Sequence, residues 1–246
     1  MIDFKIRASQ ISKIMGRSGL TEKQEDTLKS YRLRDGGDGK PLTEKQKEDF
    51  ESLKEKEKDA SLPTGCKTYL KEWYAENIYH DREEIRSKYC DKGNKMEDAA
   101  IDFTALMTGY MFLNKNEEYF DNGYIIGTPD VICDEEILDT KCSWNGTTFL
   151  DALTSPTKID YEWQMRGYMA LCGKNSARVC YCLMDTTEDV NYGKEISYSD
   201  IPKEWKFHTK LVERNMEKER AIIDRVELCR KWLLEYDREV KKALGL

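Results

Sequence analysis

The sequence predicts a mixed α/β fold in which a small central β-sheet is flanked by helices. Three observations support this prediction. Several segments place apolar residues at helical spacing, short apolar runs separated by turn residues cluster at 119–142, and another apolar run follows at 177–184. The order is helices, a strand cluster, a helix, a strand and then helices. A chain of 246 residues can bury an ample core as one large domain with appendages.

The N-terminal part is predicted to be helical after a short extended entry. Ser9 is placed to cap a helix over 10–15. About half of the residues in 21–60 are charged, with both signs interleaved, and a turn rich in glycine and aspartate divides them into two polar helices. Thr43 and Gln46 form a capping box for the second helix. We expect either an insertion projecting from the core or a solvated arm without chemistry.

The remaining elements follow in order along the chain. Helices are predicted at 69–79 and 95–109, strands within 119–142, a helix at 161–171, a strand at 177–184, and an amphipathic helical region from Pro202. We therefore predict a single domain over 1–246, with a charged helical insertion at 21–60 and a C-terminal helical region at 202–246.

Composition excludes several classes of protein. The net charge of −7 argues against a protein that coats nucleic acid non-specifically, although the local potential of a groove matters more than the total. No apolar stretch approaches the length of a membrane span and Met1 begins no signal peptide, so we expect a cytoplasmic protein without membrane contact. The eight cysteines are scattered without a C-x-x-C pair, which disfavours zinc and iron–sulfur sites.

Charged residues flank the predicted hairpin near the middle of the chain. If the loop residues are Asp134 and Glu135, Asp130 lies directly across from Asp139. Lys141 shares a face with Asp139 because it lies two residues further along the strand, whereas the intervening residue points to the other face. A solvated hairpin with a surface ion pair is the simpler interpretation. The largely apolar strand favours a half-buried site, where charges need partners or a metal.

Glu97 supplies a third carboxylate near the start of a helix that should pack on the sheet, with Asp98 as a competitor for this role. Three carboxylates and the carbonyl oxygen of Thr140 would hold one or two Mg²⁺ or Mn²⁺ ions, which prefer oxygen ligands. Such a site suits metal-assisted hydrolysis of a phosphodiester. Lys141 would orient the attacking water or stabilise charge on the phosphate.

Together these motifs resemble the signature of the PD-(D/E)xK nuclease superfamily. More narrowly, the chain resembles the lambda-type phage exonucleases, also called the YqaJ-like viral recombinase family. The resemblance rests on Pro129-Asp130, Asp139-x-Lys141, the upstream helical Glu97, Arg7-Ala8-Ser9 before a helix, and Gln164-x-x-x-Tyr168. The last two resemble the family's substrate-gripping motif and the helix motif shared with RecB-type nucleases. The matched motifs run from residue 7 to about 184.

The resemblance implies a restriction-endonuclease-like core and a role for each matched residue. Glu97, Asp130 and Asp139 would bind metal, and Lys141 would be catalytic. The residues implied to contact DNA or its phosphates are Arg7, Ser9, Thr128 and Gln164, with Tyr168 supporting Gln164.

The resemblance also implies an activity and partners. The family degrades duplex DNA from 5′ ends and hands the exposed 3′ strand to an annealing protein, and one member is a ring-shaped trimer. We therefore expect a Mg²⁺-dependent 5′-to-3′ exonuclease of phage-type recombination, acting in the host cytoplasm on double-stranded DNA with free ends, as a homotrimer with a single-strand annealing protein. An endonuclease or RecB-like repair nuclease on the same core is the alternative. A DNA-binding partner without catalysis is less compatible with the acidic set.

Two features depart from the family pattern. The family usually has a basic residue on a helix ahead of the motif at Arg7, and here that contact is either missing or supplied by Arg7, Lys13 or Arg17. The charged stretch at 21–60 is longer than the family core requires. Both departures bear on 5′-end specificity and trimer geometry more than on the cleavage chemistry.

Overall fold

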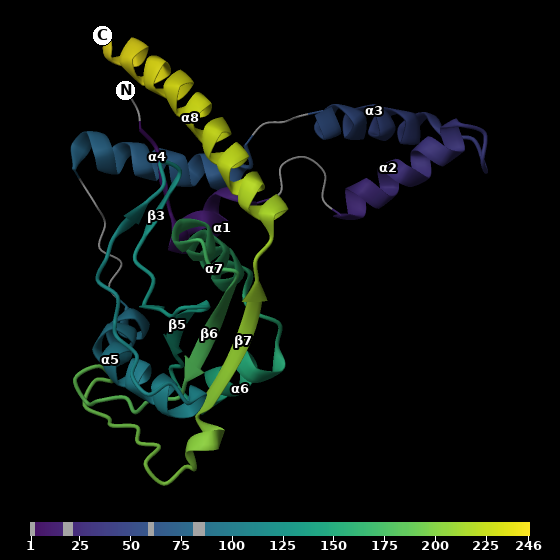
Figure 1. Cartoon of the computed structure of the whole chain (residues 1–246). Helices are drawn as coiled ribbons and strands as arrows, with labels where there is room; N and C mark the ends of the chain where they lie inside the picture. Colours follow the sequence, from purple (N-terminus) through teal and green to yellow (C-terminus); the bar gives the residue numbers. More distant parts are fainter. Residues whose placement is uncertain (1–2, 17–21, 59–61, 81–86) are drawn as a thin grey trace. The chain divides into compact units, whose positions relative to one another are not determined.

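The computed structural model describes residues 3–16, 22–58, 62–80 and 87–246 (Figure 1). The chain divides into two compact units. The first contains 1–12 and 81–227, and the second contains 13–80 and 228–246. Every residue of the predicted site belongs to the first unit.

The first unit is built on two small sheets. One has the order β4-β5-β6-β7, in which β5 and β6 are parallel and the other pairs are antiparallel. Its strands are β4 (Val131–Ile132), β5 (Glu136–Cys142), β6 (Ser176–Cys182) and β7 (Phe207–Glu213). The other sheet has the order β1-β3-β2, with β1 at Ile6–Arg7, β2 at Phe120–Asp121 and β3 at Ile125–Gly127. The predicted mixed α/β class is confirmed, whereas its restriction-endonuclease-like detail stays a prediction.

Three helices support the first sheet. They are α5 (Lys88–Thr108), which packs against β5, α6 (Gly146–Thr154), and α7 (Ile159–Cys172), which packs against β6. Helix α5 begins where the Ser87 side chain accepts a hydrogen bond from the backbone N–H of Cys90, and ends at Gly109 with φ of 79°. Asn145 forms a capping box with Thr148 at the start of α6.

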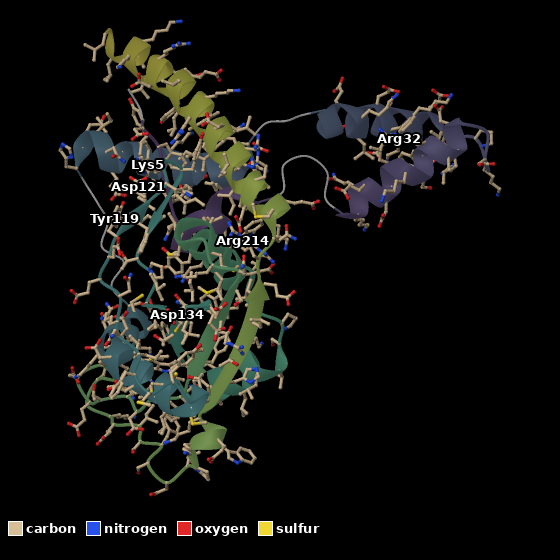
Figure 2. All side chains as sticks on the ribbon, viewed as in Figure 1. Lys5, Arg32, Tyr119, Asp121, Asp134 and Arg214 are labelled. Atoms are coloured by element: carbon tan, nitrogen blue, oxygen red, sulfur yellow. The ribbon has the colours of Figure 1, made fainter. Side chains whose placement is uncertain are left out.

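The N-terminal segment packs closely on α7 and β3. After β1 the chain forms the 3₁₀ turn η1 (Ala8–Gln10), which contacts both elements. A Cβ atom at Gly167 would lie 2.5 Å from Cδ1 of Ile11 and 3.1 Å from Cβ of Ala8, and one at Gly127 would lie 3.3 Å from Cβ of Ala8. The two glycines therefore allow the backbone of this segment to approach the site. Lys5 also binds Asp121 across the sheet at 2.7 Å (Figure 2).

The second unit is helical. It contains α2 (Glu22–Asp35), α3 (Glu44–Lys58), α4 (Thr64–Tyr79) and the C-terminal part of α8 (Met216–Leu244), while α1 (Ile11–Ile14) spans the division between the units. Helices α2 and α3 are the two polar helices expected at 21–60. They share a small core of Leu28, Leu42, Phe50 and Leu53. The expected capping box is present, with both Thr43–Gln46 hydrogen bonds formed.

The structure corrects the predicted C-terminal helical region at 202–246. Residues 207–213 form strand β7, which pairs along its whole length with β6, and continuous helix begins only at Met216. Pro202 is followed only by a short 3₁₀ turn at 203–205, and the strand comes after that turn. Strand pairing outweighed the helical pattern here because Phe207, Thr209 and Val212 fit a pleated surface well.

Other elements also differ from expectation, among them α4, which begins at Thr64 and not at 69. Ser9 lies within η1 and is not a helix cap, because a 3₁₀ turn precedes α1. Helix α5 begins at 88 and not at 95. The buried face of its first turns contains Lys92, and a lysine does not mark a buried face in the sequence. Helix α6 was not predicted. No helix in the described ranges is both long enough and apolar enough to cross a membrane.

Candidate active site

The β4–β5 hairpin sets the positions of the two aspartates. Val131 pairs with Leu138 and Ile132 with Ile137, and the backbone N–H of Cys133 donates to the carbonyl of Glu136 at 2.9 Å. The loop is therefore Asp134-Glu135, as expected, and Asp134 lies at its tip (Figure 2). Asp130 lies directly before β4, and continuing the same register would place it opposite Asp139.

Asp139 is completely buried in the middle of β5, with 0% of its surface exposed. Its Oδ1 accepts a hydrogen bond from Nε2 of Gln164 at 3.2 Å, and its Oδ2 lies 2.5 Å from Nζ of Lys141. That oxygen accepts no hydrogen bond of ordinary geometry. Burial raises the pKa of Asp139, the ammonium of Lys141 opposes this rise, and the charge of Glu97 adds to it.

Asp130 is held by the strand opposite. Its Oδ2 accepts hydrogen bonds from the backbone N–H of Thr140 at 2.8 Å and from the Thr140 hydroxyl at 3.1 Å. Burial, reinforced by the charge of Asp139, raises the pKa of Asp130 to about 7, although Lys141 and the Thr140 N–H oppose the rise. Two close carboxylates in a poorly solvated site resist ionising together, and a nearby cation would relieve this repulsion.

Lys141 is the cation already present in the cluster. Burial alone would lower its pKa, but the charges of Asp139 and Asp130 outweigh burial and raise the pKa above its ordinary value. Its ammonium also lies 5.2 Å from the centre of the Tyr161 ring. Lys141 therefore carries its charge at neutral pH.

Glu97 projects from α5, the helix that packs on β5, and its charge contributes to the raised pKa values of both aspartates. Its Oε2 is 2.9 Å from Nζ of Lys115, which also lies 3.2 Å from Oδ1 of Asp98. In the part of the chain that the structure describes, no three carboxylate, thiol or imidazole groups form a complete metal-ligand set. Each of Glu97 and Asp139 instead contacts a lysine.

Helix α7 brings its motif to the same place. Gln164 and Tyr168 are both buried, and Nε2 of Gln164 lies 3.1 Å from the Tyr168 hydroxyl as well as contacting Asp139. Gln164 thus joins the helix motif to the strand motif. A contact of Gln164 with metal or DNA stays a prediction.

The three residues expected to meet phosphate lie at the exposed edge of the same unit. Arg7 is exposed on β1, Ser9 is exposed in η1, and Thr128 is exposed directly after β3. Packing of Ala8 against Gly127 and Gly167 fixes this edge relative to α7. Their contacts with DNA stay predictions.

The sequence interpretation missed three polar residues around the site. Lys92 is buried in α5 and binds strand-end carbonyl groups, while Lys115 and Asn116 lie in the segment after α5. A lysine in an otherwise amphipathic helix and a polar stretch between elements resemble ordinary solvated surface. Only their contacts in the folded structure distinguish these three residues from ordinary surface residues.

The donor chemistry of the cluster fits a hard divalent cation. Its side-chain donors are carboxylate oxygens, and the buried Oδ2 of Asp139 lacks a hydrogen-bond donor of ordinary geometry. A divalent cation would be a further partner for this oxygen beside Lys141, and it would oppose the burial and the charge of Asp139 that raise the pKa of Asp130. Glu97, Asp130, Asp139 and the carbonyl oxygen of Thr140 are therefore retained as the candidate ligands.

Comparison with solved structures identifies the fold. The chain is similar to a phage-related exonuclease from Haemophilus somnus 129PT, with a TM-score of 0.72 and 24% identity over 98% of this chain and 96% of that one. An alkaline exonuclease from Laribacter hongkongensis is similar with a TM-score of 0.63 and 14% identity, over 98% and 93% of the two chains. The structure of the same enzyme in complex with dAMP is similar with a TM-score of 0.64 and 15% identity, over 98% of this chain and 93% of that one.

Sequence comparison adds nothing to this likeness. No family model matches the chain. No curated protein matches it either. The solved structures nevertheless confirm the resemblance that the motifs suggested, because the neighbours are phage-related and alkaline exonucleases that match almost the whole chain.

Proposed function

We propose that this protein is a metal-dependent exonuclease that hydrolyses duplex DNA from its ends, with 5′-to-3′ polarity, in phage-type recombination by strand annealing. The observation that carries the proposal is the cluster of Asp130, Asp139 and Lys141, joined to the α7 motif through Gln164. The exonuclease fold of the neighbours supports it.

Each residue of the cluster has a task in this proposal. A bound Mg²⁺ or Mn²⁺ would supply a water of lowered pKa and positive charge for the phosphate. Thr140 keeps Asp130 in place through its N–H and hydroxyl, and Gln164 orients Asp139. The ammonium of Lys141 would orient the water or stabilise charge on the phosphate.

The DNA contacts are proposed for the exposed edge. Arg7, Ser9 and Thr128 would bind the phosphates of the substrate, since hydroxyl groups and a guanidinium are suitable donors to phosphate oxygens. A homotrimer around the DNA and an annealing protein as its partner complete the proposal.

The substrate form distinguishes this proposal from its alternative. Wild-type protein is incubated with a linear duplex that carries either a 5′-phosphate or a 5′-hydroxyl, and with a covalently closed circle, in Mg²⁺ or in chelator. Labels at the 5′ and 3′ ends report the polarity.

The expected result is loss of the 5′ label from linear DNA only when Mg²⁺ is present, while the circle stays intact. Cleavage of the closed circle would identify an endonuclease. Degradation in chelator would contradict metal dependence, and earlier loss of the 3′ label would contradict the polarity.

A further inference from the structure

The segment between α5 and β2 is attached directly to the backbone that carries Asp130. The N–H of Asn116 donates to the carbonyl of Asp130 at 2.7 Å, and its side-chain amide donates to the carbonyl of Pro129 at 3.0 Å. The same side chain also donates to the carbonyl of Glu118 and accepts from the backbone N–H of Glu118. Asn116 therefore holds the segment against the candidate active site.

Lys115 is the residue next to this anchor. Its ammonium lies 2.9 Å from Oε2 of Glu97 and 3.2 Å from Oδ1 of Asp98. A lysine ammonium is charged at neutral pH, so Lys115 is a cation in contact with two carboxylates. Glu97, the third candidate metal ligand, is thus paired with a lysine from the segment that Asn116 anchors.

The exposure of this ion pair makes it replaceable. The Lys115 side chain is 41% exposed and that of Glu97 is 30% exposed, whereas Lys141 binds a carboxylate that is fully buried. Exposed ion pairs contribute little to stability, because water solvates both partners when they separate. A divalent cation that binds several carboxylates at once can displace such a partner.

We propose that Lys115 is a positioning residue that neutralises Glu97 in the metal-free protein and competes with the divalent cation for its carboxylate. The inference rests on the metal site of the proposed function. It explains why Glu97 contacts a lysine while its charge still acts on Asp130 and Asp139. It assigns Lys115 a role in setting metal affinity through its contact with Glu97.

Binding of Mn²⁺ without DNA tests this inference. Isothermal titration calorimetry is performed on the wild type and on Lys115→Met, Lys115→Arg and Lys95→Met. Lys95 is the matched control. Like Lys115 it takes part in an exposed ion pair, here with Asp189 at 2.7 Å, and its side chain is 43% exposed; it lies on α5, the helix that carries Glu97. Thermal melting of each variant confirms that it is folded.

Removal of the competing ammonium should tighten Mn²⁺ binding by Lys115→Met roughly three- to fivefold. Lys115→Arg and Lys95→Met should stay within about twofold of the wild type. Unchanged or weaker binding by Lys115→Met would overturn the inference. So would an equal gain in Lys95→Met, because the effect would then be one of net charge.

A second comparison tests whether Lys115 acts through Glu97. In a Glu97→Gln background, Lys115→Met should no longer improve the affinity, since the shared carboxylate is absent. A gain that persists there would overturn the inference. If the wild type binds Mn²⁺ and only the Lys115 variants behave unexpectedly, the proposed function stands without this inference; a wild type that binds no Mn²⁺ would overturn both.

Discussion

Asp130 and Asp139 lie close enough for their charges to interact, with little water to solvate those charges. The pKa of Asp130 rises to about 7, and that of Asp139 rises in the same direction. Lys141 compensates only part of this negative charge. The metal-free cluster is therefore strained electrostatically, which is a common property of sites that bind cations or move protons.

This strain predicts a pH dependence for the metal-free protein. The carboxyl of Asp130 has an ordinary pKa of 3.8 and a folded value of about 7. Between these values the folded state binds more protons than the unfolded state, so this group lowers the free energy of unfolding as the pH rises. With chelator present, Asp130→Asn should match the wild type near pH 4 and exceed its stability at pH 8 by at least about 1 kcal/mol.

Urea denaturation at several pH values measures this difference. Asp134→Asn is the control, because Asp134 is exposed at the tip of the same hairpin. A constant difference between Asp130→Asn and the wild type across the pH range would contradict the electrostatic argument.

At the scale of the elements, the site depends on close packing of η1, β3 and α7. Replacing Gly167 by alanine would place a Cβ atom 2.5 Å from Ile11 and 3.1 Å from Ala8. Such overpacking should lower the free energy of unfolding by about 1–3 kcal/mol. Gly93→Ala is the control, since nothing lies within 4 Å of the added atom and alanine favours a helix.

Chemical denaturation of the two alanine variants tests this packing. Gly93→Ala should be neutral or more stable by up to about 1 kcal/mol. Equal stability of Gly167→Ala and Gly93→Ala would show that the backbone of η1 does not need the space at Gly167.

Lys92 joins α5 to the ends of two strands. Its ammonium donates to the carbonyls of Ser143, Trp144 and Met184 at 2.8, 3.0 and 2.7 Å. Burial lowers the pKa of Lys92 to about 8, which leaves it largely protonated at neutral pH. Lys92→Met should destabilise the protein by about 3 kcal/mol, because three acceptors lose their donor. A loss below about 1 kcal/mol by denaturation at pH 7 would contradict this role.

The sequence predicted the elements whose signal is local. The hairpin register followed from a two-residue polar loop, and the polar helices of 21–60 followed from charge pattern and a capping box. The prediction of helix over 207–213 was wrong, because a segment of mixed pattern adopts the structure that pairing with its neighbour β6 imposes. Lys92, Lys115 and Asn116 could not be predicted, since their partners lie far away along the chain.

At the scale of the whole molecule, the described structure comprises two compact units, and all candidate site residues lie in one of them. The net charge is −7, so the proposed binding of DNA would depend on the local arrangement of cations and on the proposed metal. A homotrimer around the substrate is one arrangement that would retain DNA despite this charge. It stays a prediction of the family resemblance.

The oligomeric state can be measured directly. Sedimentation equilibrium should give a mass three times that of the 28.8 kDa chain, and the mass should not change with added Mg²⁺. A mass equal to that of one chain at micromolar concentration would contradict the trimer but leave the chemistry of the site untouched.

The central claim is that the carboxylates of the β4–β5 hairpin hydrolyse DNA with a divalent metal. Release of nucleotides from a uniformly labelled linear duplex in Mg²⁺ tests it most directly, with Asp139→Asn compared with Asp134→Asn. Loss of a buried metal ligand costs several kcal/mol of transition-state stabilisation, so the account predicts a rate at least about 1000-fold below wild type for Asp139→Asn and an unchanged rate for Asp134→Asn. A folded Asp139→Asn protein that retains the wild-type rate would contradict it.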